Sequence, residues 1–245
     1  MRNIRTIALA AATATLVVSA LGAPASAAFG KGDIAVVNGR PGPSLDICIG
    51  NVKIKRNLPY GGKYWRSLNM GDKLLRAFIA NGKARCGGTK VAQHPFGLVD
   101  GGDLTFVVTR KSPDKVVVYD NAAIATLGSV QPIGPLLLTA AFAWRTAADL
   151  AAVNIFFKVR VTLPDTPVGP SVNPVWAKGD QVTSESPPGY EWQVRATFPE
   201  KTKSIAVARL QEMFGGRRYE WIFVGTTGKN ARWVKFSRRA YQLGP

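Results

Sequence analysis

The chain has 245 residues, a formal net charge of +17 at pH 7, one histidine and two cysteines. A single histidine excludes a multi-histidine metal site, and it leaves a cysteine nucleophile with at most one histidine as its base. The positive charge favours anionic partners such as wall polymers, acidic polysaccharides, lipid headgroups or extracellular DNA, although a basic surface can also serve solubility alone.

The first element in chain order is an export signal. Arg2 and Arg5 form a basic start, residues 7–21 are apolar, and Ala25-Ser26-Ala27 supplies the small residues of a cleavage site. The apolar run is shorter than the roughly 20 residues that span a bilayer, and no cysteine directly follows it for lipid attachment. We expect residues 1–27 to be a signal peptide cleaved after Ala27. The mature chain is then secreted or envelope-associated, has no transmembrane segment and carries a net charge of +15.

Short alternating or β-branched runs follow, separated by turns rich in glycine and proline. Residues 45–49 and 52–55 alternate apolar and polar side chains around Gly50-Asn51, and such a pair tolerates the positive φ of a tight hairpin turn. The expected strands of the first half are residues 34–38, 45–49, 52–55, 63–68, 73–80, 104–109 and 116–120. Strands this short, with turns every 8–12 residues, predict a β-sandwich of about 100 residues.

The second half repeats landmarks of the first in the same order. The matched segments are 45–49 with 153–157, 71–77 with 189–196, 104–108 with 219–224, and 116–119 with 233–236. Internal similarity of this kind indicates duplication. We therefore predict an all-β protein of two tandem antiparallel β-sandwich repeats, immunoglobulin- or transthyretin-like, with a first domain at residues 28–127, a linker at 128–135 and a second, diverged domain at 136–245. Residues 204–214 fit either a strand or a short helix, and we expect a strand.

The two cysteines are Cys48 and Cys86. In an exported protein an even pair of cysteines indicates a disulfide, which would close a loop of about 39 residues. Two free thiols are the alternative.

A family resemblance is carried by the segment Leu45-Asp46-Ile47-Cys48-Ile49-Gly50, by Asn57-Leu58-Pro59-Tyr60-Gly61 ten residues on, and by Asp120-Asn121. These motifs resemble the bacterial secreted domain-of-unknown-function family 4397, over residues 34–121 and, through the internal repeats, in the second half. Cys48 stands where that family usually has tyrosine, and Gly39-Arg40-Pro41 replaces its usual Ala-Ser-Pro. The resemblance implies a β-sandwich at or outside the cell envelope, and it supplies no catalytic residues.

The sequence shows no signature of a catalytic, cofactor-binding or metal-binding site, since it lacks Gly-x-Ser-x-Gly, Ser-x-x-Lys and phosphate-cradling loops. Asp100 and Asp103 could ligate calcium, but the Gly101-Gly102 turn between them favours carboxylates that cap the backbone. Asp46 is expected to accept hydrogen bonds at the end of a loop. We expect a non-enzymatic binding protein without a cofactor. The alternatives are a hydrolase of an envelope polymer and a structural subunit that assembles through edge strands.

Two clusters combine basic and aromatic side chains. The first comprises Lys53, Lys55, Arg56, Lys63, Tyr64, Trp65 and Arg66. The second is the candidate polyanion-binding site, and it comprises Arg217, Arg218, Trp221, Arg232, Trp233, Lys235, Arg238 and Arg239. Such side chains attract anions and stack on sugar or base rings, whereas a solvated sheet face or protected strand edges would also explain each cluster. No motif for sequence-specific nucleic-acid binding is present.

Overall fold

The structure is a computed structural model, and it describes residues 30–111, 115–121, 132–133, 137–138, 140–150, 153–161, 167–176, 178–186, 190–198, 201, 203–208, 211–212, 214 and 217–239. The predicted signal peptide, its cleavage site and most of the predicted linker lie outside these residues. Every regular element among the described residues is a strand. These residues include no helix that is long and apolar enough to cross a membrane.

The described residues of the first half form eight strands. They are β1 (Lys31–Asn38), β2 (Leu45–Ile49), β3 (Val52–Leu58), β4 (Lys63–Asn69), β5 (Gly71–Ile79), β6 (Lys90–Leu98), β7 (Asp103–Val108) and β8 (Val116–Asp120). They make two sheets, with strand orders β4-β1-β7-β8 and β3-β2-β5-β6. The apolar residues between these sheets form one core, to which Ile34, Ile47, Leu75 and Phe106 contribute fully buried side chains.

The second half repeats this arrangement. Its strands are β11 (Ala140–Thr146), β12 (Val153–Val161), β13 (Pro167–Trp176), β14 (Gln181–Ser186), β15 (Tyr190–Thr197), β16 (Ser204–Val207), β17 (Gln211–Glu212), β18 (Arg217–Val224) and β19 (Arg232–Arg239), preceded by the small pair β9 (Pro132–Ile133) and β10 (Leu137–Leu138). The sheet orders are β14-β11-β18-β19 and β13-β12-β15-β16, with β17 also paired to β15. Their shared core is aromatic, with Phe142, Trp144, Trp221 and Phe223 at its centre.

The all-β fold class with two tandem sandwiches is confirmed, and β16 and β17 confirm a strand within residues 204–214. Each segment that repeats in the sequence falls on an equivalent strand, for example residues 104–108 on β7 and residues 219–224 on β18. This correspondence supports duplication. The predicted domain limits, 28–127 and 136–245, stay predictions because residues 122–131 are not described.

Two details differ from the sequence-based expectation. Each half contains one parallel pair, β1 with β7 and β11 with β18, within otherwise antiparallel sheets. In addition, β6 was not predicted, because Pro95 and Gly97 within it are typical of turns. The strand tolerates a proline because it lies at the edge of its sheet, where one row of backbone groups needs no partner.

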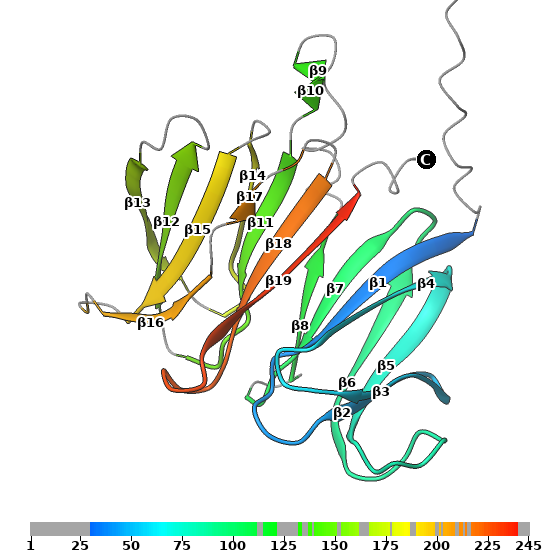
Figure 1. Cartoon of the computed structure of the whole chain (residues 1–245). Coiled ribbons are helices and arrows are strands. Elements are labelled where there is room, and N and C mark those ends of the chain that lie inside the picture. The colour runs from blue at the N-terminus through cyan, green and yellow to red at the C-terminus, as the bar shows by residue number, and fades with distance from the viewer. Residues whose placement is uncertain are drawn as a thin grey trace, which may run out of the picture.

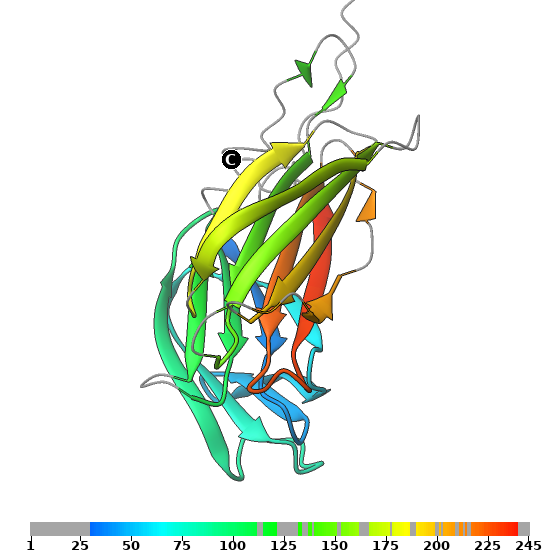
Figure 2. The same ribbon diagram turned by 90° about the vertical axis from the view of Figure 1, so that its left-hand side faces the viewer.

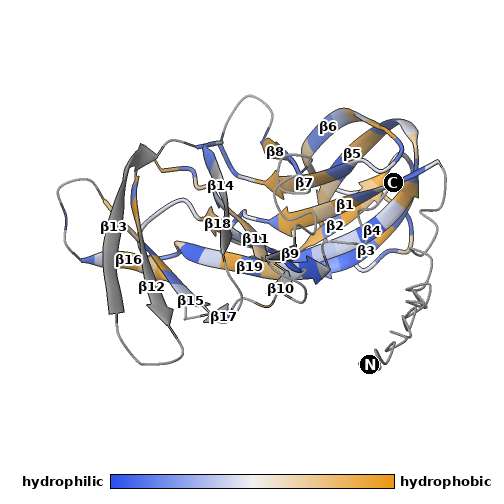
Figure 3. Cartoon of the chain, turned by 90° about the horizontal axis from the view of Figure 1, so that it is seen from above, coloured by the Kyte–Doolittle hydropathy of each residue, from blue (hydrophilic) through white to orange (hydrophobic). Residues whose placement is uncertain are grey.

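The two sandwiches pack against each other through the sheets β4-β1-β7-β8 and β14-β11-β18-β19 (Figure 1). Seen from the side of the second sandwich, its strands lie in front of those of the first (Figure 2). We call the layer between these two sheets the seam. Its apolar part joins Val37, Val107 and Tyr119 of the first sandwich to Ile222 and other residues of the second. The inner strands of these two sheets, such as β1, β7 and β18, are therefore buried on both faces. This explains why β1 and β7 are mainly hydrophobic, while β3 and the edge strand β4 are at the surface and more hydrophilic (Figure 3).

The turn at residues 59–62 attaches one edge of the seam. Gly61 has a φ of 73°, which glycine adopts without strain, and this shape brings the preceding tyrosine towards the second sandwich. The hydroxyl of Tyr60 donates a hydrogen bond to the carbonyl of Asn230, and the guanidinium of Arg232 lies 4.3 Å from the centre of the Tyr60 ring. The turn that carried the family resemblance is thus a contact between the two sandwiches.

Asp149 attaches the opposite edge. Its carboxylate accepts hydrogen bonds from the backbone N–H groups of Arg110 at 2.7 Å and Lys111 at 2.9 Å, and it pairs with Lys178 at 2.5 Å. The first sandwich contributes the two backbone donors and the second contributes both charged side chains. The seam is therefore closed by polar contacts at both edges.

The predicted disulfide between Cys48 and Cys86 is present, with the two Cα atoms 6.3 Å apart. It joins buried strand β2 to the loop between β5 and β6. We expect that replacing both cysteines (Cys48→Ala with Cys86→Ser) lowers the free energy of unfolding by roughly 2–4 kcal/mol, because the unfolded chain loses its cross-link. Urea unfolding followed by tryptophan fluorescence measures this. Dithiothreitol should destabilise the native protein to a similar extent and leave the variant unchanged, whereas free thiols in protein purified without reductant would contradict the bond.

Candidate functional site: the seam and its groove

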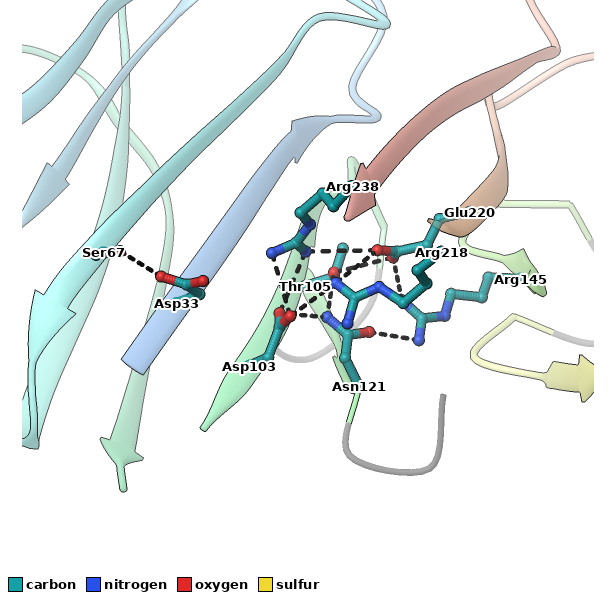
Figure 4. A network of polar contacts seen from close by, with 9 residues as sticks. All are labelled: Asp33, Ser67, Asp103, Thr105, Asn121, Arg145, Arg218, Glu220 and Arg238. Atoms are coloured by element: carbon teal, nitrogen blue, oxygen red, sulfur yellow. Dashed lines mark hydrogen bonds and ion pairs between the residues drawn. The ribbon is translucent and has the colours of Figure 1, made fainter. Parts of the chain in front are cut away.

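Among the residues that the structure describes, three arginines and two acids form a network of ion pairs in the polar part of the seam (Figure 4). Asp103 comes from the first sandwich, and the other four charges come from the second. Arg145 pairs with Glu220 at 2.5 Å, and Arg218 pairs with Asp103 at 2.7 Å and with Glu220 at 3.2 Å. Arg238 pairs with Asp103 at 3.1 Å and with Glu220 at 3.4 Å. The side chain of Arg238 is 12% exposed and the other four are at most 3% exposed, so this network is an internal one.

Neutral side chains complete the network. Thr105 donates a hydrogen bond to Glu220 at 3.1 Å, while the amide of Asn121 donates to Asp103 at 2.7 Å and accepts from Arg145 at 2.6 Å. Burial lowers the pKa of Arg145, and the nearby carboxylate of Glu220 opposes this shift. Because an arginine begins from so high a pKa, it keeps its proton at neutral pH. The network therefore has one positive charge in excess.

This geometry corrects part of the predicted polyanion-binding surface. Arg218 and Trp221 are each only 1% exposed. Arg218 points into the seam and is bound by carboxylates, whereas Trp221, the third residue after it, points to the opposite face of the sheet and packs in the aromatic core. Neither residue can reach an external ligand. Arg238 is mostly buried as well, although one side of it borders a groove.

The remaining residues of the predicted set lie on the edge strand β19 of the same sheet, apart from Arg217 at the start of β18. Arg232 is exposed and stacks on Tyr60. Trp233 packs partly against the aromatic core, 5.2 Å from Phe223 between ring centres. Lys235 is half-buried, and Arg217 pairs through its backbone with Arg239 at the end of β19. The predicted cluster is thus spread over several environments and does not form one surface.

A groove of about 600 Å³ lies where β4 of the first sandwich meets β19 of the second. It is lined by Ala35, Lys63, Tyr64, Trp65, Arg217, Phe236, Ser237 and Arg238. The structure therefore brings together parts of the two clusters that the sequence separates by about 150 residues. Trp65 is 46% exposed, and the guanidinium of Arg238 lies 5.9 Å from the centre of its ring.

The cations of the groove differ in their partners. Arg238 is paired with the two buried carboxylates below it, which it shares with Arg145 and Arg218. Lys63 donates a hydrogen bond to the backbone carbonyl of Lys235 and lies 5.6 Å from the centre of the Phe236 ring. Burial lowers the pKa of Lys63, and the positive charge of Lys235 adds to this. Neither Lys63 nor Arg217 forms an ion pair with a residue that the structure describes, so both can receive an anion.

The side chains of the first basic and aromatic cluster, at residues 53–66, also lie in different environments. Lys53 is buried against Asp46 at 2.5 Å, and Lys55 lies over the ring of Tyr64 at 5.7 Å. The expectation that Asp46 accepts hydrogen bonds is confirmed: burial alone would raise its pKa, but the bonds from Lys53 and from the backbone of Asn57 outweigh it and hold the pKa below its ordinary value. Only the β4 part of this cluster reaches the groove.

The two aspartates considered for calcium also have other roles. Asp100 accepts backbone hydrogen bonds from Gly30 at 2.8 Å and Lys31 at 3.2 Å, which confirms the capping interpretation for this residue. Asp103 points into the seam and binds arginines. Within the residues that the structure describes, no group of three or more potential ligands is placed to hold a metal ion.

Sequence reasoning missed Phe236 and Ser237 as groove residues. The sequence did contain a signal for Phe236. Every second residue of a strand lies on the same face, so Phe236 shares a face of β19 with Val234 and Arg238, and this face meets the first sandwich. Which strand of the other sandwich would lie opposite could not be derived from one sequence.

No protein-family model matches the chain, and no curated protein matches it either. The resemblance to family 4397 therefore stays a prediction.

Solved structures provide only distant similarities. The TIE protein of Bacillus anthracis is 12% identical with a TM-score of 0.23; the match covers 80% of this chain and 33% of that one, so this chain spans about a third of its length. A protein of Bacteroides ovatus, whose assignment to cell adhesion is provisional, is also 12% identical with a TM-score of 0.23, over 86% of this chain and 97% of its own. The carbohydrate-binding module CBMbc of Eubacterium rectale Amy13K, solved with maltoheptaose, is 7% identical with a TM-score of 0.24, over 85% and 96%. Scores this low carry no argument about function.

The buried network predicts a large loss of stability when one acid is removed. Glu220→Gln leaves three buried arginines facing one carboxylate, and we expect the free energy of unfolding to fall by about 3–5 kcal/mol, as for other broken buried ion pairs. Urea unfolding measures the loss. The exposed Asp72→Asn is the matched control and should change the free energy by less than about 0.5 kcal/mol. Equal stability of the two variants would mean that the seam is open in solution.

The lowered pKa of Lys63 predicts a pH dependence of anion binding. A lysine whose pKa is lowered loses its positive charge at a lower pH than an ordinary lysine, whose pKa is 10.5. Binding that depends on Lys63 should therefore weaken as the pH rises towards that lowered value, while Lys63→Arg keeps its charge and should retain binding. Titration of a carboxylated polysaccharide at constant ionic strength and rising pH measures this, with Lys83→Arg as the control. The interpretation is wrong if Lys63→Arg has the same alkaline profile as the native protein.

Proposed function

We propose that this protein is exported, is not an enzyme, and binds anionic polymers of the cell envelope or its surroundings in the seam groove. The observation that carries the proposal is the groove itself, where Lys63 and Arg217 lie beside the exposed ring of Trp65 without an ion pair to any residue that the structure describes. Positive charge beside an aromatic face suits a charged polymer with rings, since attraction acts at a distance and stacking acts at contact. A net charge of +15 in the mature chain would add long-range attraction.

Binding is preferred over hydrolysis because of what lines the groove. Polymer hydrolysis by acid–base chemistry needs a pair of groups that can exchange protons near neutral pH, most often carboxylates or a histidine. Among the residues that the structure describes, those that line the groove include no carboxylate, histidine or cysteine. The carboxylates of Asp103 and Glu220 are held by arginines below the groove, and that of Asp33, which acts on Arg238 from β1, accepts a hydrogen bond from Ser67.

The disulfide supports an exported location, since such bonds form and persist in oxidising compartments. This agrees with the predicted signal peptide and with the location that the family resemblance implies. Recovery of the native chain from the medium or the envelope fraction, beginning at Ala28, would establish export.

Charge removal in the groove tests the function. The double variant Lys63→Gln with Arg217→Gln should bind a carboxylated polysaccharide about tenfold more weakly than the native protein, and its salt dependence should fall by about two ions. The matched control, Lys31→Gln with Lys83→Gln, removes the same charge from exposed positions outside the groove and should lose less than about threefold. Equal losses would show that only the overall charge attracts the polymer and would reject the groove as a site.

A further inference from the structure

The number of unpaired cations in the groove limits the kind of polymer that it suits. Arg238 already contacts Asp103 and Glu220, which leaves Lys63 and Arg217 as the cations without an ion pair to a described residue. Asp33 acts on Arg238 from the side of the first sandwich, so a negative charge also lies close to the groove. A ligand that carried a charge on every unit would place more negative groups here than the available cations can neutralise.

The aromatic surface is also restricted to one place. Trp65 is the only lining residue among the large exposed hydrophobic side chains of the described structure. Phe236 packs partly into the apolar seam, and the Lys63 ammonium lies over its ring. One indole face offers stacking for a single ring, and the apolar faces of sugars and the faces of bases both suit it.

From these two observations we infer that the groove takes an acidic polysaccharide in which carboxylated sugars are separated by uncharged ones. The apolar face of a sugar ring stacks on Trp65, and the neighbouring carboxylate lies between Lys63 and Arg217. The planar guanidinium of Arg217 suits a carboxylate because two parallel N–H donors match its two oxygens. Single-stranded nucleic acid fits less well, since each of its units has a phosphate. This inference rests on the proposed function and names its ligand class.

The experiment separates ring recognition from charge. Three probes are compared at one ionic strength: hyaluronan, which alternates a carboxylated with an uncharged sugar; poly-L-glutamate, which has carboxylates without rings; and dextran, which has rings without charge. The native protein should bind hyaluronan at least about tenfold more tightly than poly-L-glutamate, since stacking adds to the charge, and should not bind dextran measurably.

Trp65→Ala should lose about tenfold in affinity for hyaluronan and less than about twofold for poly-L-glutamate, while Trp65→Phe, which keeps a ring, should restore most of the affinity. Val99→Ala, at an exposed apolar position outside the groove, is the matched control and should change neither. Thermal unfolding of each variant shows that it is folded. Because Trp65 is partly exposed, its replacement should leave the fold intact.

Each outcome has a separate meaning. If hyaluronan and poly-L-glutamate bind equally and Trp65→Ala weakens neither, the inference is overturned while the groove charges can still bind polyanions. If poly(dT) binds more tightly than hyaluronan and loses affinity in Trp65→Ala, the ligand is a single-stranded nucleic acid and the inference is again overturned. If the Lys63 and Arg217 double variant behaves like its surface control with every probe, the proposed function itself fails.

Discussion

The structure depends on the pairing of charges in a layer that water does not reach. The inner strands of the two facing sheets are buried on both faces, so a charge where these strands meet must find its partner across or within the seam. The cost of an unpaired buried charge exceeds that of losing most apolar contacts. Removing Asp103 or Glu220 would therefore leave buried arginines short of a partner, because three arginines share these two carboxylates.

The groove is a consequence of the same constraint. Arg238 lies at the border of the network, with its charge bound from below and its upper side next to Trp65. Because β4 and β19 belong to different sandwiches, the groove exists only while the seam is closed. The proposed ligand binding would therefore be thermodynamically linked to the association of the two halves, and a bound polymer would stabilise the closed arrangement.

The sequence predicted elements with local signals and missed what depends on remote packing. The hairpin around Gly50 has alternation and a turn within a few residues, and it was predicted correctly. Strand β18 alternates Arg218 and Glu220 with Trp221 and other aromatics, which is the pattern of a strand with one face in water. The first sandwich instead covers its polar face. There Arg218 binds Asp103, which is 115 residues away in the sequence. Alternation separates two faces, but it cannot indicate what covers them.

The two halves share a strand order but offer unlike faces to the seam. The first presents Asp103 with neutral hydrogen-bonding groups, and the second presents three arginines with Glu220. Two copies of the second half would place arginines opposite arginines, and two copies of the first would leave their acids without cations. The chain thus resembles a heterodimer whose subunits have been fused. Complementary charge makes each half selective for the other and disfavours self-association through the same face.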